Sequence, residues 1–393
     1  MSQKIKEKSK GMEIRASLNL RKENNKSNRG ITLIALVITI IVLLILAAVT
    51  IATLTGDNGI LSNASKAREE TEESQEEELK IIQEMEMLVA SENGEIYNYE
   101  YTNKKGEIIT VPIPSGFTMS EIEREQTVEE GFVIKDSRGN EYVWIPCTTD
   151  EENSQLKYQR TEWGVESDGG TRAIKDELEF TDPDITYTQT ELDNGINAET
   201  SQEIVNQINA EKTSVEKYGG FYIGRYEVGN ESNIAVIKQN QVPYNTITWS
   251  KAYSLAKSIG GGKNAETYLC SSYAWDTAIN FIQNNGATNY ATRITGFNGN
   301  WLSQEVKDKD GNIIKESEEG KRLNTGLTTA QSNIYDMGGN MAEYTTELNP
   351  GTSEPVVVRS GTYSNDCAAG YRWDCYAATA TSHYGIRATL FLK

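Results

Sequence analysis

The fold is decided by a stretch near the C-terminus, NIYDMGGNMAEY, residues 333–344. Its two adjacent glycines, Gly338 and Gly339, predict a turn, because glycine adopts the left-handed backbone conformations that tight turns need. An acid lies on each side, Asp336 before the glycines and Glu343 after them. The simplest interpretation is a turn flanked by two solvated carboxylates.

Three further stretches, taken outward from this one, agree in order with one known family. They are Gly219–Glu227, the helix pattern Tyr244–Ile259 with its start at Ile247-Thr248-Trp249, and Arg359–Tyr363 followed by Gly385–Arg387. Together the four stretches resemble the formylglycine-generating-enzyme (sulfatase-modifying factor) family, and residues 333–344 look like its signature N-x-Y-D-M-x-G-N-x-x-E-[WY]. The resemblance covers about residues 105–393 and implies an irregular α+β fold related to C-type lectins.

The resemblance also implies a calcium site in the 333–344 stretch. By position, Asp336 and Glu343 would supply side-chain oxygens, and Gly339 and Met341 would supply backbone carbonyls. Calcium takes about six to eight oxygen ligands, and carboxylates and carbonyls on a tightly turning chain provide them. Calcium binding and a plain turn are both open interpretations of these residues.

Copper is not expected. The enzyme of this family oxidises a sulfatase cysteine with two C-terminal cysteines of its own, which bind copper. Alignment on Arg359–Tyr363 puts Asn365 and Gly370 at the corresponding places, whereas Cys367 and Cys375 lie nearby at a different spacing. We therefore assign no catalytic residue, and a formylglycine-generating oxidoreductase acting on sulfatases is an alternative function. The two cysteines could form a disulfide or remain thiols.

The window Ser360–Tyr384 differs in composition from the rest of the chain. It reads SGTYSNDCAAGYRWDCYAATATSHY and contains no Lys, Glu, Gln or Met. Tyr, Trp, Asn and Ser give large contact area and adaptable hydrogen bonds at low entropy cost, which is typical of binding loops. The window therefore predicts a ligand-contacting surface formed by Tyr363, Asn365, Asp366, Tyr371, Trp373, Asp374, Tyr376, His383 and Tyr384.

The window also resembles the variable region of proteins that a retroelement diversifies by randomising the adenines of Asn codons. Tyr, Ser, Asp, Cys, Ala, Gly, Thr and His can be reached from an Asn codon in this way, and Lys, Glu, Gln and Met cannot. Trp373 cannot be reached either, so it would belong to the fixed scaffold or come from another codon. A polar, turn-rich surface of an invariant protein is the other interpretation.

The N-terminal part predicts a membrane anchor. Residues Ile31–Leu54 are apolar, with no charge between Arg29 and Asp57, and a helix of this length would cross the hydrocarbon core. Residues 1–30 are rich in Lys and Arg, which by the positive-inside rule keeps the N-terminus in the cytoplasm. We therefore expect a single-pass cell-membrane protein with an extracellular C-terminal domain. A cleaved secretory signal is the weaker alternative, because the apolar run is longer than the core of such a signal.

The junction Gly30-Ile31 resembles the cleavage site of type IV prepilins, so prepilin peptidase is an expected partner. Pilins of that family usually carry a glutamate at the fifth mature position, where it helps the subunits to assemble. This chain has Ala35 there. A pilin-like structural subunit is therefore an alternative, and a processed anchor is the main interpretation.

The remainder is expected to form a helical stalk over 55–94 and a globular domain over 95–393, with polar insertions at about 148–217 and 284–332. Alternating and apolar runs predict strands, and periodic runs between capping residues and glycines predict helices. The expected strands are 108–113, 131–135, 141–145 and 219–228, and the expected helices are 60–90, 201–210, 249–259 and 275–282. Thr248 is the expected cap of the helix over 249–259, and Asp308–Asn312 predicts a hairpin turn.

Composition limits the classes of function. The net charge of −19 argues against nucleic acid or anionic lipid as a ligand. One histidine and four cysteines are too few for a zinc cluster or for a confident catalytic triad. We therefore expect a cell-surface, adhesin-like or receptor-like protein that binds an extracellular protein or glycan without chemistry.

Overall fold

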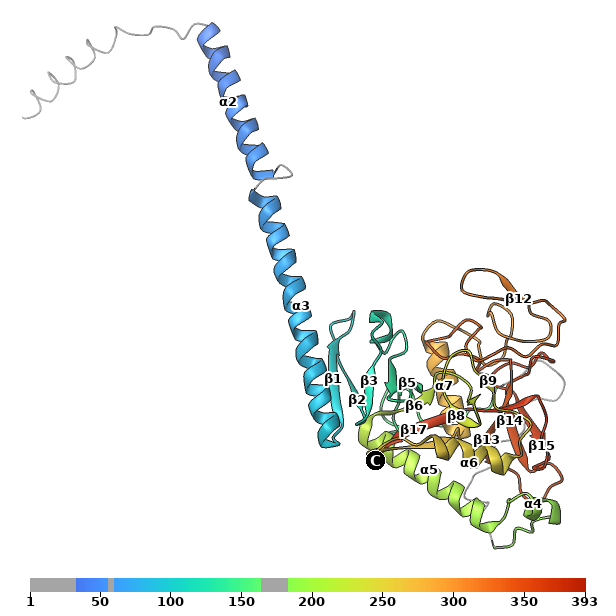
Figure 1. Cartoon of the computed structure of the whole chain (residues 1–393). Helices are drawn as coiled ribbons and strands as arrows, with labels where there is room; N and C mark the ends of the chain where they lie inside the picture. Colours follow the sequence, from blue (N-terminus) through green and yellow to red (C-terminus); the bar gives the residue numbers. More distant parts are fainter. Residues whose placement is uncertain (1–32, 56–59, 164–182) are drawn as a thin grey trace, which may run out of the picture. The chain divides into compact units, whose positions relative to one another are not determined.

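A computed structural model describes residues 33–55, 60–163 and 183–393, and the chain divides into two units, Met1–Ile82 and Gln83–Lys393. Helix α2 covers Leu33–Thr55, and α3 covers Ile60–Asn93 (Figure 1). The helix predicted over 60–90 is thus observed as α3. Its last turns belong to the second unit, where the buried Met87 joins the hydrophobic core.

The prediction of a membrane anchor is corrected by the structure. Crossing the hydrocarbon core takes about 20 consecutive, mostly apolar residues in one helix. In the described parts of the chain, no helix combines the length and the apolarity that a membrane crossing requires. The transmembrane helix predicted over Ile31–Leu54 and the single-pass location in the cell membrane are therefore wrong for the described residues. The predicted cleavage site Gly30-Ile31 lies outside those residues.

The second unit is built around a six-stranded antiparallel sheet (Figure 1). Its strands, in spatial order, are β10 (Ala265–Leu269), β17 (Ala388–Leu392), β6 (Gly220–Gly224), β5 (Glu141–Pro146), β4 (Val133–Asp136) and β3 (Phe117–Met119). Successive side chains point to opposite faces of a strand. In β5, Tyr142 and Trp144 therefore join one apolar cluster, whereas Val143 and Ile145 join the other. The sheet is consequently buried on both faces.

Three helices complete these two clusters. They are α5 (Ala198–Tyr218), α6 (Trp249–Ile259) and α7 (Ser272–Asn284). Thr248 caps α6 through its hydroxyl on the Lys251 amide, as the sequence predicts, and Ser271 caps α7 in the same way. The buried side chains of α6 join the first cluster and those of α7 join the second, so the two helices cover opposite faces of the sheet.

A second sheet of four strands carries the C-terminal window. Its order is β15 (Arg372–Cys375), β14 (Val356–Arg359), β13 (Ala342–Leu348) and β16 (Tyr384–Ile386). The β13–β16 pair is parallel and the other two pairs are antiparallel. The α+β class is therefore confirmed, and the window begins after β14 and ends on β16.

The remaining elements are short. They are β1 (Tyr97–Thr102) with β2 (Ile108–Ile113), β7 (Gly229–Glu231) with β8 (Ile234–Val236) and β9 (Val242–Pro243), the hairpin β11 (Val306–Lys307) with β12 (Ile313–Lys315), the 3-10 turn η1 (Glu123–Glu125) and helix α4 (Gln189–Asp193). The turn between β11 and β12 is made by Asp308–Asn312, as its sequence predicts.

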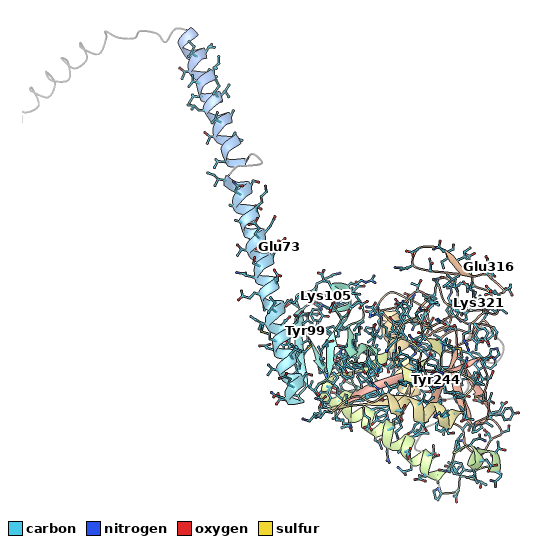
Figure 2. All side chains as sticks on the ribbon, viewed as in Figure 1. Glu73, Tyr99, Lys105, Tyr244, Glu316 and Lys321 are labelled. Carbon is cyan, nitrogen blue, oxygen red and sulfur yellow. The ribbon has the colours of Figure 1, made fainter. Side chains whose placement is uncertain are left out.

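The segment around this hairpin is held by a buried lysine. The ammonium group of Lys315 lies within hydrogen-bond distance of four backbone carbonyls, those of Trp301 and Gln304 at 2.7 Å, of Glu316 at 3.1 Å and of Leu302 at 3.2 Å, which share its three donors. Trp301 is fully buried and donates from its indole nitrogen to the Cys367 carbonyl at 2.8 Å. In Figure 2, Glu316 and Lys321 mark the outer part of the segment. Its inner part therefore supports the start of the window.

Candidate functional site

The two strands that flank the start of the window are fixed by a buried ion-pair cluster. Asp276 on α7 accepts from Arg359 at 2.6 Å and also pairs with Arg372. Arg372 donates in addition to Glu347 on β13 at 3.1 Å. All four side chains are fully buried, and Arg359 and Arg372 face each other across β14 and β15. Together these ion pairs hold α7, β13, β14 and β15.

The cluster is closed by a segment from the polar region before α5. The Thr161 amide donates to Asp276 at 3.0 Å, and the Trp163 indole donates to it at 3.2 Å. Burial and the neighbouring charge of Arg372 lower the pKa of Arg359 to about 10, because both disfavour another positive charge there. The guanidinium is still charged at neutral pH, so the cluster depends on Asp276.

The turn of the 333–344 stretch holds the other side of the window. Gly339 has φ of +85°, and a side chain there would meet the Asn300 backbone at 2.8 Å, so only glycine fits. Its amide donates to the Ser360 hydroxyl at 2.9 Å, and the Tyr363 amide donates to the Asn340 carbonyl at 2.9 Å. The turn therefore positions the first residues of the window directly.

Buried charged side chains form hydrogen bonds and an ion pair with residues of this turn and of the strand after it. The amide side chain of Asn340 donates to Glu227 at 2.6 Å, and the Met341 backbone amide donates to the same carboxylate at 3.1 Å. Arg387 pairs with Glu343 through two bonds of 2.7 and 2.9 Å. Burial raises the pKa of Glu343 to about 7, although the charge of Arg387 opposes the shift.

The expected calcium ligands lie in one region of the structure. Their carboxylate oxygens already accept hydrogen bonds from other residues of the protein. Asp336 accepts from the Thr328 hydroxyl at 2.7 Å and from the Gly326 amide at 2.9 Å, and both oxygens of Glu343 face Arg387. In the described ranges, no group of three or more His, Cys, Asp or Glu side chains could hold a metal ion. As arranged, this donor set fits calcium poorly, and calcium at Asp336, Gly339, Met341 and Glu343 stays a prediction.

A cavity of about 320 Å³ lies at the window. It opens between the start of β13, the turn after β14 and the residues leading into β16. Its lining consists of Ala342, Thr362, Ser364, Asn365, Trp373, Thr379, Thr381, His383 and Tyr384. Of these residues, all except Ala342 belong to the window. The cavity is thus a feature of the segment whose composition predicts binding.

Aromatic contacts hold the wall of the cavity in place. The ring of Tyr363 stacks on His383 with centroids 5.1 Å apart, and the Tyr363 hydroxyl lies 3.1 Å from that of Ser382. Tyr371 packs edge-on against Trp373, with centroids 5.4 Å apart. Such ring pairs add stability beyond simple burial, so they help to hold His383 and Trp373 in the wall of the cavity.

The structure brings together most of the predicted contact residues. Asn365, Trp373, His383 and Tyr384 line the cavity, and Tyr363 and Tyr371 support it from behind. The other three lie elsewhere. Asp366 accepts from the Ser303 amide at 3.0 Å, Asp374 lies on β15, and Tyr376 is 51% exposed outside the cavity lining. Ligand contact by any of these residues stays a prediction.

The sequence-based list misses the small and hydroxylated part of the lining. These residues are Ala342, Thr362, Ser364, Thr379 and Thr381. All but Ala342 lie in the same window, and a search that weighted hydroxyl groups as strongly as aromatic rings would have found them. Ala342 belongs to the 333–344 stretch, where only the pairing of β13 with β16 places it beside Tyr384.

The two C-terminal cysteines lie in different surroundings. Cys375 is buried in β15 opposite Val356, and burial raises the pKa of its thiol to about 12. Cys367 lies in the turn after β14, where its carbonyl accepts from Trp301. A thiol is a poor copper ligand until it loses its proton, so the environment of Cys375 disfavours the metal. That copper does not bind stays a prediction.

A larger hollow, of about 1170 Å³, lies elsewhere on the second unit. Its buried arginine is already paired, since Arg225 contacts Glu125 at 2.6 Å and Glu141 at 2.8 Å. The same hollow is lined by Tyr226 and Tyr335, which stack on each other. We assign the candidate site to the smaller cavity, because its lining comes almost wholly from the window whose composition predicts binding.

No protein-family model matches the chain, and no curated protein matches it. Solved structures show weak similarity, each over 44% of this chain. They include CarF, at 12% identity over 87% of that chain with a TM-score of 0.32, and variable protein 1 of Treponema denticola, at 14% over 85% with a TM-score of 0.30. PvdO from Pseudomonas aeruginosa is 13% identical over 82% of its chain, with a TM-score of 0.29. Similarities of this size carry no argument about function, so the candidate site rests on its own geometry.

Proposed function

We propose that this chain is a ligand-binding protein and that its ligand occupies the cavity of the window Ser360–Tyr384. One observation carries the proposal: the segment whose composition is typical of binding loops is also the segment that lines a cavity. The lining offers aromatic faces, hydroxyl groups and an amide on a rigid base of buried ion pairs. Small-molecule sites have this character, with a few polar groups placed on a preformed wall.

The proposal predicts that a single hydroxyl in the cavity matters for binding. Thr379→Val replaces a hydroxyl by a methyl of similar shape, so the fold is kept while a hydrogen bond to the ligand is lost. We expect affinity to fall roughly tenfold, since a lost bond to a buried partner costs about 1–2 kcal/mol. The full chain is screened against arrayed extracellular proteins and glycans, and each hit is titrated with both proteins.

The matched control is Thr118→Val. Thr118 is an exposed threonine on β3 that lies outside the cavity of the window and lines the larger hollow, so it also reports on binding there. Affinity for every hit should be unchanged in this variant. Ligands that bind both variants as tightly as the original chain would place the binding site elsewhere and would contradict the proposal.

We also propose that the window is diversified. The support is the composition of the window. In addition, the window contains both cavity-lining positions, which could vary, and buried positions, which the fold needs. Ser364 and Asn365 line the cavity, whereas Arg372 is 3% exposed and pairs with two buried acids. Resequencing the 3′ end of the gene from many cells of one population should show changes at Ser364 and Asn365 and none at Arg372 or Trp373. An identical window in all cells would contradict diversification and leave the binding proposal intact.

A further inference from the structure

We propose that the ligand group that enters the cavity is an uncharged, hydroxyl-rich unit, such as a neutral sugar residue of a glycan. The inference rests on the proposed function and narrows its ligand class. It comes from the kinds of atoms that line the cavity, from one buried donor and from the size of the space.

The lining carries no permanently charged side chain, and its one titratable base is the imidazole of His383. Its described residues include no Lys, Arg, Asp or Glu. A bound phosphate, sulfate or carboxylate would therefore have no Lys or Arg beside it, the Nδ1 atom of His383 is already engaged with the Thr381 hydroxyl at 2.8 Å, and an ammonium would have no carboxylate. Placing a charge in a partly desolvated site without a partner is strongly unfavourable. The site consequently favours neutral ligands.

The polar groups in the lining match the hydrogen-bonding pattern of hydroxyl groups. Thr362, Ser364, Thr379 and Thr381 present hydroxyls, which both donate and accept. Asn365 uses its side-chain oxygen on the Thr362 amide at 2.7 Å, so its amide nitrogen remains to donate. A ligand hydroxyl also donates and accepts, so it can satisfy this mixed set.

Trp373 supplies the independent observation. The indole nitrogen of Trp373 is buried, and within the described part of the chain it has no hydrogen-bond partner. Buried donors are rarely left in this state, because an unmade bond is unfavourable. Once the ring turns toward the cavity, an oxygen of the ligand would be its acceptor, and the indole ring would offer an apolar face. Sugar rings combine these two properties, since oxygens project from a ring with apolar faces.

The size of the cavity favours one unit of a chain. At about 320 Å³ it lies near the lower limit of small-molecule sites, which begin at roughly 300 Å³. A single ring fits such a space, and the rest of a glycan would leave through its open side. A folded protein ligand would instead rely on exposed positions such as Tyr376, which lies outside the lining.

The test is titration of the full chain with soluble oligosaccharides followed by tryptophan fluorescence and calorimetry. The probes are neutral hexose and N-acetylhexosamine oligosaccharides, with sialylated and sulfated versions of the same chains for comparison. We expect neutral probes to bind, with affinity that changes less than about twofold between low and high salt. Asn365→Ala and Thr379→Val should each weaken binding roughly tenfold, and Thr118→Val should not.

Three results would overturn the inference. The first is binding that requires the anionic groups, and the second is neutral binding that Asn365→Ala and Thr379→Val leave unchanged. The third is a combination of two findings: no saccharide binds, and an arrayed protein binds more weakly to Thr379→Val than to the original chain. That third result would retain the proposed function and exclude only the neutral-sugar class. A protein or glycan that binds without sensitivity to either variant would instead remove the proposed function itself.

Discussion

Replacing Asp276 by alanine is expected to lower the free energy of unfolding by about 3–5 kcal/mol. The change leaves the guanidinium groups of Arg359 and Arg372 buried, with Glu347 as the remaining acid of the cluster. Breaking one partner of a buried ion pair has this effect because an uncompensated charge stays in a low-dielectric interior. Urea unfolding of the full chain, followed by tryptophan fluorescence, measures the difference.

The control is Asp310→Ala, which removes an exposed acid from the turn between β11 and β12. Its effect should stay within about 0.5 kcal/mol, as for most surface substitutions. If Asp276→Ala does not fold, Asp276→Asn keeps the shape of the side chain and should give a smaller loss in the same direction. A loss below about 1 kcal/mol for both Asp276 variants would contradict a central role for this carboxylate.

The second large effect concerns the pH dependence of stability. Glu211 on α5 is fully buried and accepts from Tyr158 at 2.6 Å, from Ser271 at 2.7 Å and from Gln207 at 2.8 Å. Burial raises the pKa of its carboxyl to about 7 from an ordinary value of 4.5, although these hydrogen bonds oppose the shift. The folded state therefore holds a proton that the unfolded state has lost.

Stability should consequently fall as pH rises from about 4.5 to about 7, and this contribution is constant above that range. The shift corresponds to about 3 kcal/mol. Glu211→Gln keeps a neutral side chain at every pH, so the difference in unfolding free energy between pH 5 and pH 8 should shrink by about this amount. Unfolding by urea at several pH values gives both curves.

Glu216→Gln provides the comparison on the same helix, because the Glu216 side chain is exposed. Its curve should run parallel to that of the original chain. If Glu211→Gln also gave a parallel curve, the proton would not be held by Glu211 in the folded state.

Local signals in the sequence identify several elements of the fold. The strand predicted over 108–113 is β2, and the helix predicted over 249–259 is α6 with the expected cap at Thr248. These succeed because alternation, capping and glycine stops act within a few residues. The helix predicted over 201–210 is longer, Ala198–Tyr218, since Asn197 caps it and Gly219 ends it in the left-handed conformation.

Long-range pairing explains what the sequence does not reveal. Polar composition hides the fact that Glu211 and Tyr158 are buried, because two polar groups that bond each other can enter a core together. The same holds for Asp276 and Arg359, which are far apart in the chain. For the candidate site, composition selects the window, but only the observed sheet order shows that Ala342 and Tyr384 are neighbours. The membrane prediction was wrong for a related reason. It inferred the location of the whole chain from one local apolar run.

The parallel pairing of β13 with β16 has a consequence for evolution of the site. Residues 376–383 leave β15 and return on β16, and both strands belong to one sheet whose order is fixed by β13 and β14. The connection is therefore a loop with both ends already fixed, and doubling its length would cost only about 0.6 kcal/mol of closure entropy. Ala377 is buried, and the carbonyls of Thr379 and Thr381 accept from Tyr344 and Thr246. Insertions should therefore be tolerated best beside the exposed Ala378 and Ala380, where the site can change in shape as well as in side chains.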